Sequence, residues 1–279
     1  MLKIDKPLVS VSCLNANLSA ENLIVLDATI PKVTSEQKTL AEKVQIPGTI
    51  FFDLRGVFLD KNGLYPNTLP SEQLFEEEAQ KLGIHTDSCI VVYDDLGIYS
   101  SARVWWLFKT FGFDNIAVLD GGLPEWKKHD FLLEKQAFKN KSKGNFKAKF
   151  NSEKFTNTEK VLSIINNPNY CVADARSSDR FYGRVEEPRK GVRGGHIPNS
   201  NSLPYTSLQK EGKMRSSEEL TDIFKNINSS NKDYIFTCGT GITACVIALA
   251  LELTGKTNYA IYDGSWTEWG SRTELPIAL

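Results

Sequence analysis

The chain has 279 residues, of which 41% are hydrophobic and 24% charged, and its formal net charge is −1. This composition is typical of a globular protein with room for two domains of ordinary size. The balanced charge argues against a general nucleic-acid or membrane-surface binder, although it allows a local basic pocket. No apolar run is long enough to span a bilayer, and the N-terminal stretch lacks the apolar core of a secretory signal.

The predicted elements alternate between strands and helices along the chain. The first helix is expected to start at an N-cap serine, Ser71, and to stop at Gly83, and the next ends at Gly112. Later helices are expected to begin at a cap, Ser217, and to end at Gly255. Short apolar runs that suit buried parallel strands lie between and before these helices, within 22–30, 45–54, 89–97, 116–126, 169–177, 196–205, 233–241 and 259–269.

The two halves of the chain repeat one another. Asp27 matches Asp174 at an offset of 147 residues, and Trp126 matches Trp269 at an offset of 143. A steady offset near half the length indicates two copies of one domain. Strands alternating with helices predict an α/β fold with a mainly parallel sheet in each copy. We place the first domain at residues 1–135, a linker at 136–157 and the second domain at 158–279.

The predicted linker is rich in lysine and asparagine and has no clear period. A basic tail for nucleic acid is the alternative interpretation. Solvated lysine-rich segments are common between domains, so we favour a linker and expect no nucleic-acid partner.

The two copies differ where one strand hands over to a helix. The first copy reads "VYDDLGIYSSARVWW" and the second "IFTCGTGITACVIAL", so that Cys238 stands where the first copy has Asp94. In parallel sheets ligands gather at the carboxyl ends of strands. A cysteine in only one copy therefore predicts one active half and one supporting half.

The residues around Cys238 favour a nucleophile. Backbone amides at a helix N-terminus stabilise negative charge, which here means a thiolate. Gly239 and Gly241 allow the loop to curl tightly, and the hydroxyls of Thr240 and Thr243 can donate to a nucleophile or substrate. A buried structural cysteine is the alternative, and it is the interpretation that we prefer for Cys245, inside the helix.

The whole chain resembles the rhodanese superfamily, in the form that 3-mercaptopyruvate sulfurtransferases use. "CGTGITA" is similar to the family's active-site loop, and the resemblance extends to other stretches. These are "RVWWLFKTFG", "VLDGGLPEW", "DARSSDRFYG", "EEPRKGVRGGHIPNS" and "DGSWTEWG". The resemblance implies two tandem rhodanese-like domains, with the catalytic cysteine in the second, and no metal or cofactor.

The resemblance also implies a reaction. The Cys238 thiolate would take sulfur from 3-mercaptopyruvate, release pyruvate and pass the sulfur from a persulfide to cyanide, a small thiol or thioredoxin. By the motif match, Arg180 and Arg189 would bind the donor. Thr240 would act beside the cysteine, and the remaining loop residues would line the substrate site, namely Gly239, Gly241, Ile242 and Thr243.

The loop indicates which donor is preferred. Thiosulfate-preferring relatives carry an Arg-Lys pair after the cysteine, whereas Gly239 and Thr240 are neutral. A neutral loop favours the monoanionic keto acid. A thiosulfate sulfurtransferase, or a relay that delivers sulfur to a protein, for example toward tRNA thiolation, is the alternative function. A phosphatase would need a Cys-x5-Arg loop, and no arginine follows Cys238 at that spacing.

The chain departs from the family at the partners of the loop hydroxyl. Many mercaptopyruvate enzymes supply an aspartate and a histidine from the first domain, and by hand alignment these fall at Arg55 and Asn67. A full hydroxyl–His–Asp relay is therefore not expected. Instead, the thiolate, the loop amides and Thr240 would carry the reaction, or Asn67 would orient a water.

Other polar residues are given structural roles. Asp174 is expected to organise a strand end, and Arg180 has a salt bridge to Asp174 or Asp179 as its alternative. His196 matches Gln45 of the first copy, which favours a hydrogen-bonding role. We expect Arg184 and Arg193 to be solvated, and the matched Trp126 and Trp269 to pack in the cores. Five cysteines without a framework of spacings indicate a reduced, cytoplasmic setting.

Overall fold

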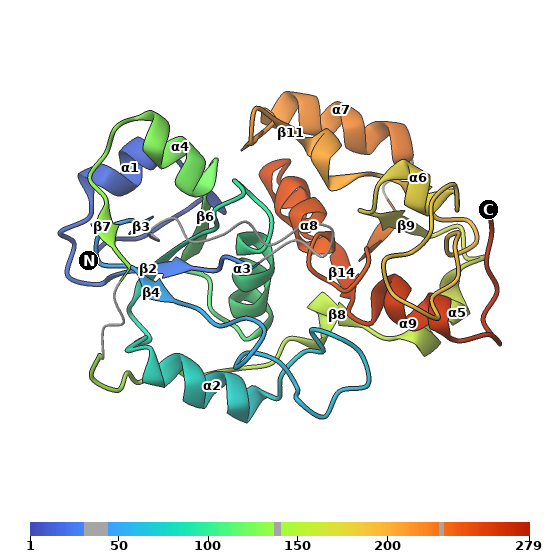
Figure 1. Ribbon diagram of the computed structural model, residues 1–279, viewed down its shortest axis with the longest axis horizontal. Coiled ribbons are helices and arrows are strands. Elements are labelled where there is room, and N and C mark those ends of the chain that lie inside the picture. Colours follow the sequence, from blue (N-terminus) through green and yellow to red (C-terminus); the bar gives the residue numbers. More distant parts are fainter. Residues whose placement is uncertain (31–43, 137–140, 229–231) are drawn as a thin grey trace. The chain divides into compact units, whose positions relative to one another are not determined.

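The computed structural model describes residues 1–30, 44–136, 141–228 and 232–279. The chain divides into two compact units (Figure 1). Unit 1 consists of Met1–Leu59, Leu69–Phe150 and Glu211–Met214. Unit 2 consists of Asp60–Thr68, Asn151–Lys210 and Arg215–Leu279. Each unit therefore takes most of one sequence half and one short segment of the other.

Unit 1 is built on a five-stranded parallel sheet. Its central strands carry the apolar runs seen in the sequence, and every residue of the middle strand is buried. The order across the sheet is β1 (Leu8–Val9), β6 (Ile116–Leu119), β5 (Cys89–Tyr93), β2 (Leu23–Asp27) and β4 (Ile50–Phe51). Each neighbouring pair is parallel.

Helices cover both faces of this sheet. One face is covered by α1 (Val11–Ala16) and α4 (Gly122–Lys128), and Trp126 of α4 shares a buried cluster with Val25 and Val91 of the sheet. The other face carries α2 (Glu72–Lys81) and α3 (Ser101–Thr110). On that face Phe75 of α2 meets Phe108 of α3 with ring centroids 5.0 Å apart. Aromatic packing thus fills the second half of the core.

Unit 2 repeats the same sheet. The order is β10 (Asn201–Ser202), β9 (Tyr170–Asp174), β13 (Asp233–Thr237), β14 (Tyr259–Tyr262) and β8 (Phe155–Thr156), and all pairs are parallel. One face is covered by α5 (Thr158–Ile164) and α9 (Ser265–Ser271), the other by α7 (Ser217–Ile227) and α8 (Ala244–Leu253). The predicted α/β fold with two tandem copies is confirmed.

The remaining elements are short. They comprise β3 (Val44–Gln45), β7 (Glu134–Lys135), η1 (Ser152–Lys154), α6 (Ser178–Phe181), η2 (Tyr205–Leu208), β11 (Gln209–Lys210) and β12 (Lys213–Met214). None of the helices in the described ranges is long and apolar enough to cross a bilayer.

Helix ends follow the sequence signals with one shift. Ser71 caps α2 as predicted, because its hydroxyl accepts from the amide of Leu74. The cap of α7 is Ser216 and not the predicted Ser217, since Ser216 forms a reciprocal capping box with Glu219. An acidic residue three positions later is what distinguishes the two serines.

Part of the predicted linker packs on unit 1. Phe146 is fully buried, and its amide donates to the carbonyl of Ile84 at 3.1 Å. The side-chain amide of Gln80 donates to the Phe146 carbonyl at 2.8 Å. Residues 137–140 of the predicted linker lie outside the described residues, and the domain boundaries drawn from sequence remain a prediction.

Candidate active site

Cys238 directly follows the central strand β13 of unit 2. Its neighbour Thr237 is in register with Asp174 at the end of β9, so the cysteine lies at the carboxyl edge of the sheet. The residue is 1% exposed. Three loop residues later, Gly241 takes φ = 77°, a conformation that glycine adopts without strain, and α8 begins after Thr243. The predicted strand–loop–helix setting of the cysteine is confirmed.

In the matching loop of unit 1, the backbone binds the carboxylate of a side chain. The carboxylate of Asp94 is fully buried. Its oxygens accept from the amides of Leu96 at 2.9 Å, Tyr99 at 2.8 Å and Ser101 at 2.9 Å, and from the Ser101 hydroxyl at 2.6 Å. Gly97, with φ = 104°, makes the turn. The amides of Leu96, Tyr99 and Ser101 therefore form a binding site for a negatively charged group, which we call the cradle.

The counterparts in unit 2 follow residue by residue at an offset of 144, the separation of Asp94 and Cys238. Leu96, Tyr99 and Ser101 correspond to Thr240, Thr243 and Cys245, and Gly97 corresponds to Gly241. Both matched glycines have positive φ, so the two loops turn at the same place. Cys238 thus occupies the position at which unit 1 holds a carboxylate.

A serine on α9 fixes the backbone of the cysteine. The hydroxyl of Ser265 accepts from the Cys238 amide at 3.1 Å and donates to the Tyr262 carbonyl at 2.8 Å. The Cys238 carbonyl in turn accepts from the amide of Trp266 at 2.9 Å. Ser265 is fully buried and has φ = 51°, which is strained for a residue with a side chain.

Sequence reasoning missed Ser265. The available signal was the repeat, since the first copy has Gly122 at this place with φ = 55°. A serine that keeps a glycine conformation indicates that its hydroxyl has a specific function.

Arg180 lies against the cysteine loop. A β carbon added to Gly239 would be 3.3 Å from Nη2 of Arg180. The guanidinium is 22% exposed and pairs with both oxygens of Glu187, Nε–Oε1 at 3.2 Å and Nη2–Oε2 at 2.5 Å. The expected alternative partners of Arg180 were Asp174 and Asp179, and the salt bridge is instead made to Glu187.

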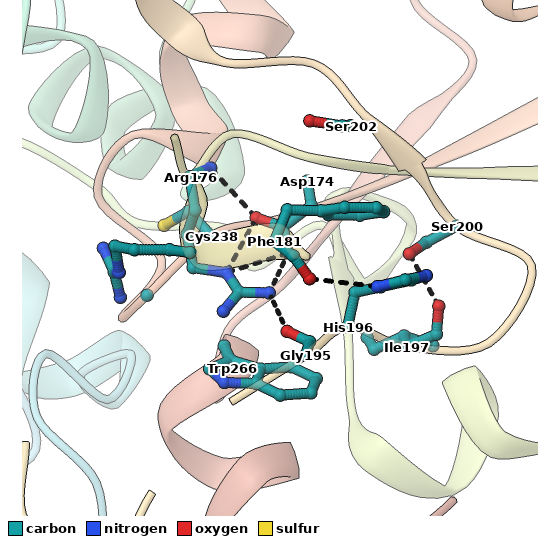
Figure 2. A network of polar contacts seen from close by, with 12 residues as sticks. Asp174, Arg176, Phe181, Gly195, His196, Ile197, Ser200, Ser202, Cys238 and Trp266 are labelled. Carbon is teal, nitrogen blue, oxygen red and sulfur yellow. Dashed lines mark hydrogen bonds and ion pairs between the residues drawn. The ribbon is translucent and has the colours of Figure 1, made fainter. Parts of the chain in front are cut away.

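A second arginine, Arg176, holds the end of β9, and the sequence analysis did not identify it. Nε and Nη2 donate to the carboxylate of Asp174, and Nη2 also donates to the Gly195 carbonyl at 2.8 Å (Figure 2). The guanidinium lies 4.3 Å from the ring centroid of Trp266 and is almost fully buried. The expectation that Asp174 organises a strand end is confirmed, with Arg176 as its partner.

Thr240 and Asn67 meet within unit 2. Thr240 is 7% exposed, and its carbonyl accepts from the side-chain amide of Asn67 at 3.4 Å. Asn67 is buried and has φ = 62°, a region that asparagine tolerates better than most residues. Arg55, at the place expected for the family aspartate, is exposed. The nearby Asp53 lies outside the strands, and its carboxylate accepts from the Gly56 amide.

The other predicted site residues are placed as follows. Ile242 is buried, Thr243 is half-buried as the N-cap of α8, and Arg189 is half-buried in a turn whose carbonyl accepts from Val192. Arg184 is exposed, as expected. The expectation for Arg193 was wrong, because its guanidinium donates to backbone carbonyls of α9 and the segment after it. These belong to Trp269, Gly270, Arg272 and Leu275.

Residues given structural roles keep them. His196 stacks on Phe181 with centroids 3.8 Å apart, and its Nδ1 lies 3.0 Å from the Phe181 carbonyl oxygen. Burial lowers the pKa of His196. Trp126 and Trp269 are fully buried in the cores of their units.

Three of the other cysteines are buried and poorly suited to react. Burial raises the pKa of the Cys89 and Cys171 thiols to about 11. Cys245 is fully buried in α8, and its thiol donates to the Gly241 carbonyl at 3.2 Å. Cys13 is exposed, and all five cysteines are free. Within the described residues, no group of three or more His, Cys, Asp or Glu side chains could hold a metal ion.

Comparison with known protein families matches the rhodanese-like domain twice, at residues 10–129 and 157–272. The chain belongs to the rhodanese-like family. "Thiosulfate/3-mercaptopyruvate sulfurtransferase 1, mitochondrial" from Arabidopsis thaliana is 38% identical over 98% of this chain and 78% of its own length. "3-mercaptopyruvate sulfurtransferase" from Escherichia coli K12 is 35% identical over 96% of both chains.

Two solved structures share the fold over nearly the whole chain. The crystal structure of SseA from Escherichia coli, described as a 3-mercaptopyruvate sulfotransferase, superposes with a TM-score of 0.83 at 32% identity. It covers 94% of this chain and 99% of its own. The Tum1 protein from Saccharomyces cerevisiae gives a TM-score of 0.86 at 28% identity, with 96% of each chain covered.

Proposed function

We propose that this protein is a sulfurtransferase that moves sulfur from 3-mercaptopyruvate to a thiophilic acceptor through a persulfide on Cys238. One observation carries the assignment of the site. Cys238 replaces a carboxylate, Asp94, that the same loop holds with three amides in unit 1. A loop that accommodates a carboxylate also suits a thiolate and a persulfide anion. Relatives named as 3-mercaptopyruvate sulfurtransferases support the donor.

The first half-reaction transfers the donor's sulfur. The Cys238 thiolate attacks the thiol sulfur, a S–S bond forms and the C–S bond of the donor breaks. The electron pair of that bond becomes the enolate of pyruvate, which takes up the thiol proton on its methylene carbon. Pyruvate leaves, and Cys238 carries an anionic persulfide.

The second half-reaction returns the cysteine. Cyanide attacks the outer sulfur, thiocyanate leaves and the thiolate is restored. A thiol attacks in the same way and keeps its proton on the new persulfide. Two half-reactions through one covalent intermediate give ping-pong kinetics. Thioredoxin is the protein acceptor that we propose.

The surrounding residues divide the remaining work. Arg180 and Arg189 bind the carboxylate and ketone of the donor, because guanidinium groups hold planar anions well. Gly239, Gly241, Ile242 and Thr243 line the site. Thr240 supplies a hydroxyl beside the sulfur, and Asn67 holds the Thr240 carbonyl at 3.4 Å in place of a histidine relay.

Donor choice follows from the charge of the loop. Gly239 and Thr240 carry no charge, which favours the monoanionic keto acid over the dianionic thiosulfate. Thiosulfate is the second candidate donor, since two relatives from Arabidopsis thaliana are named for both donors.

The proposal extends to organisation and compartment. The second domain, residues 158–279, is the catalytic one, and the first, 1–135, is a supporting copy with the linker 136–157 between them. Four buried free cysteines support a reducing, cytoplasmic setting. Fractionation of cells with an antibody to the protein tests the compartment, and recovery from organelles would contradict it.

The decisive experiment compares thiocyanate formation from 3-mercaptopyruvate and thiosulfate for wild type, Cys238→Ser and Cys245→Ser. We expect activity with mercaptopyruvate that falls by about 10³-fold or more in Cys238→Ser, because the nucleophile is lost. Cys245→Ser is the matched control, since a serine hydroxyl can also donate to Gly241, and it should retain activity. Intact-mass measurement after donor treatment should show one added sulfur atom in wild type only. Turnover in Cys238→Ser would refute the role of Cys238 as the nucleophile. A higher efficiency with thiosulfate would refute the preference for 3-mercaptopyruvate.

A further inference from the structure

Four charged side chains form a continuous network of ion pairs at the edge of the candidate site. Asp174 binds Arg176, Arg176 binds Glu187 through Nη1 at 2.8 Å, and Glu187 binds Arg180. Two positive and two negative charges alternate along it. The side chains of Asp174, Arg176 and Glu187 are at most 3% exposed, and only Arg180 reaches solvent.

Glu187 pairs with both arginines of this network. Its Oε1 accepts from Arg176 and from Nε of Arg180, and its Oε2 accepts from Nη2 of Arg180. A carboxylate in this position occupies the Nε–Nη2 edge of Arg180, so an incoming anion meets the Nη1 edge of the guanidinium. Glu187 therefore sets both the direction and the net charge that Arg180 presents beside Gly239.

Arg176 makes Glu187 a fixed partner. Its guanidinium is held by Asp174, by the Gly195 carbonyl and by the ring of Trp266. Trp266 also donates its amide to the Cys238 carbonyl. The carboxylate is thus anchored to the same backbone that holds the cysteine, and it cannot leave Arg180 without breaking buried contacts.

We infer that Glu187 is a specificity-determining residue, which keeps the Arg180 end of the site near neutrality and so selects a monoanionic over a dianionic sulfur donor. The inference rests on the proposed function and deepens it. Removal of the Glu187 charge leaves an uncompensated positive charge at Arg180. A dianion gains about twice as much Coulomb energy from that charge as a monoanion does.

The test measures kcat/KM for thiosulfate and for 3-mercaptopyruvate in wild type and Glu187→Gln, with cyanide as acceptor. We expect the ratio of thiosulfate to mercaptopyruvate efficiency to rise on the order of tenfold in Glu187→Gln, and the rise to shrink at high salt. A purely structural role would lower both efficiencies together and leave the ratio unchanged.

The matched control is Asp179→Asn. Asp179 lies on α6 beside Arg180, is 62% exposed and pairs with Arg184 at 3.6 Å. This variant removes one negative charge from the helix that carries Arg180, without touching the Arg180 guanidinium. Its ratio should change less than about twofold, because exposed charges are screened.

Glu187→Asp covers the case in which Glu187→Gln does not fold. Aspartate keeps the charge for Arg176, but it is one methylene shorter and cannot reach Arg180 with both oxygens. The ratio should shift in the same direction by about threefold, since the neutralisation is weaker. An unchanged ratio in either folded variant overturns the inference. Wild-type protein that uses neither donor would instead refute the proposed function.

Discussion

The loop after β5 and the loop after β13 follow one path around different side chains. In the first loop, the carboxylate of Asp94 accepts four hydrogen bonds from loop residues. Cys238 sits at the corresponding point with a larger, softer atom, and its amide is held from α9 by Ser265. In the first loop the charge belongs to the protein and is permanently bound. In the second, the position is left to a group that can react.

This difference explains why one fold supports both a structural and a chemical role. A carboxylate that fills its cradle makes the loop rigid and leaves the donors nothing else to bind. A thiolate in the same place is a nucleophile whose charge moves outward when it becomes a persulfide. The loop thus binds a fixed carboxylate in unit 1, and we propose that in unit 2 the same backbone path serves the reaction.

The largest expected effect concerns the contribution of Asp94 to the stability of its loop. Asp94→Ala should lower the free energy of unfolding by about 3 kcal/mol, because three backbone amides and a hydroxyl lose their acceptor, a fully buried carboxylate. Cys238→Ala should cost only about 1 kcal/mol, the value for loss of a small buried group. Urea unfolding of both variants measures the difference.

Asp95→Ala is the control for that experiment. Asp95 is adjacent in sequence and its side chain is exposed, so the change should be within about 0.5 kcal/mol. Equal losses of stability for Asp94→Ala and Cys238→Ala would break the comparison.

A smaller effect concerns Ser265. Ser265→Ala keeps the strained backbone but removes the acceptor for the Cys238 amide, so kcat should fall about tenfold while KM changes little. Ser265→Gly removes the same hydroxyl and relieves the strain at φ = 51°. It should therefore be the more stable of the two variants.

Steady-state kinetics and thermal unfolding of the two variants test these expectations together. The hydroxyl matters for catalysis if both variants lose kcat to the same extent. Full activity in Ser265→Gly would show that the cysteine loop holds its geometry without this contact.

The smallest effect compares His196 with its counterpart Gln45. The pKa of His196 is lowered from 6.5 by burial, so the unfolded chain binds more protons than the folded one near and below pH 6.5. Stability should therefore fall as the pH drops below about 6.5. His196→Gln, which copies unit 1, should remove this contribution.

Urea unfolding between pH 5 and pH 7 gives the slope. Wild-type protein measured in parallel supplies the reference slope. An unchanged slope in His196→Gln would assign the acid sensitivity to other groups.

Much of the fold could be predicted from the sequence, because the repeat and the strand–helix periods are local patterns. The position of Cys238 followed from the same logic, since a strand end and a glycine turn are visible in the letters. Arg180 was found through its motif. The partner of Arg180 was not, because the choice among Asp174, Asp179 and Glu187 depends on how loop 182–195 folds back.

Other contributions had no local signal. The burial of Arg176 is not visible in the sequence. Arg193 was expected in solvent because its backbone acceptors lie far along the chain, at residues 269–275. The cap at Ser216 was missed by one position because two serines adjoin. Asn67 could be aligned with the family histidine, but its contact with the Thr240 carbonyl depends on a segment that joins unit 2.

The reciprocal choice of Gly122 and Ser265 also constrains how two copies of a duplicated gene can diverge. A β carbon on Gly122 would run into the carbonyl oxygens of Asp94 and Gly97, whereas Ser265 keeps its side chain at the same φ. Conversion of Asp94 to cysteine would not by itself recreate the second loop, because no hydroxyl would reach the new cysteine's amide. A serine introduced first at position 122 would collide with these two carbonyl oxygens. We therefore expect the two substitutions to depend on one another, because neither alone would convert the loop of unit 1 into that of unit 2.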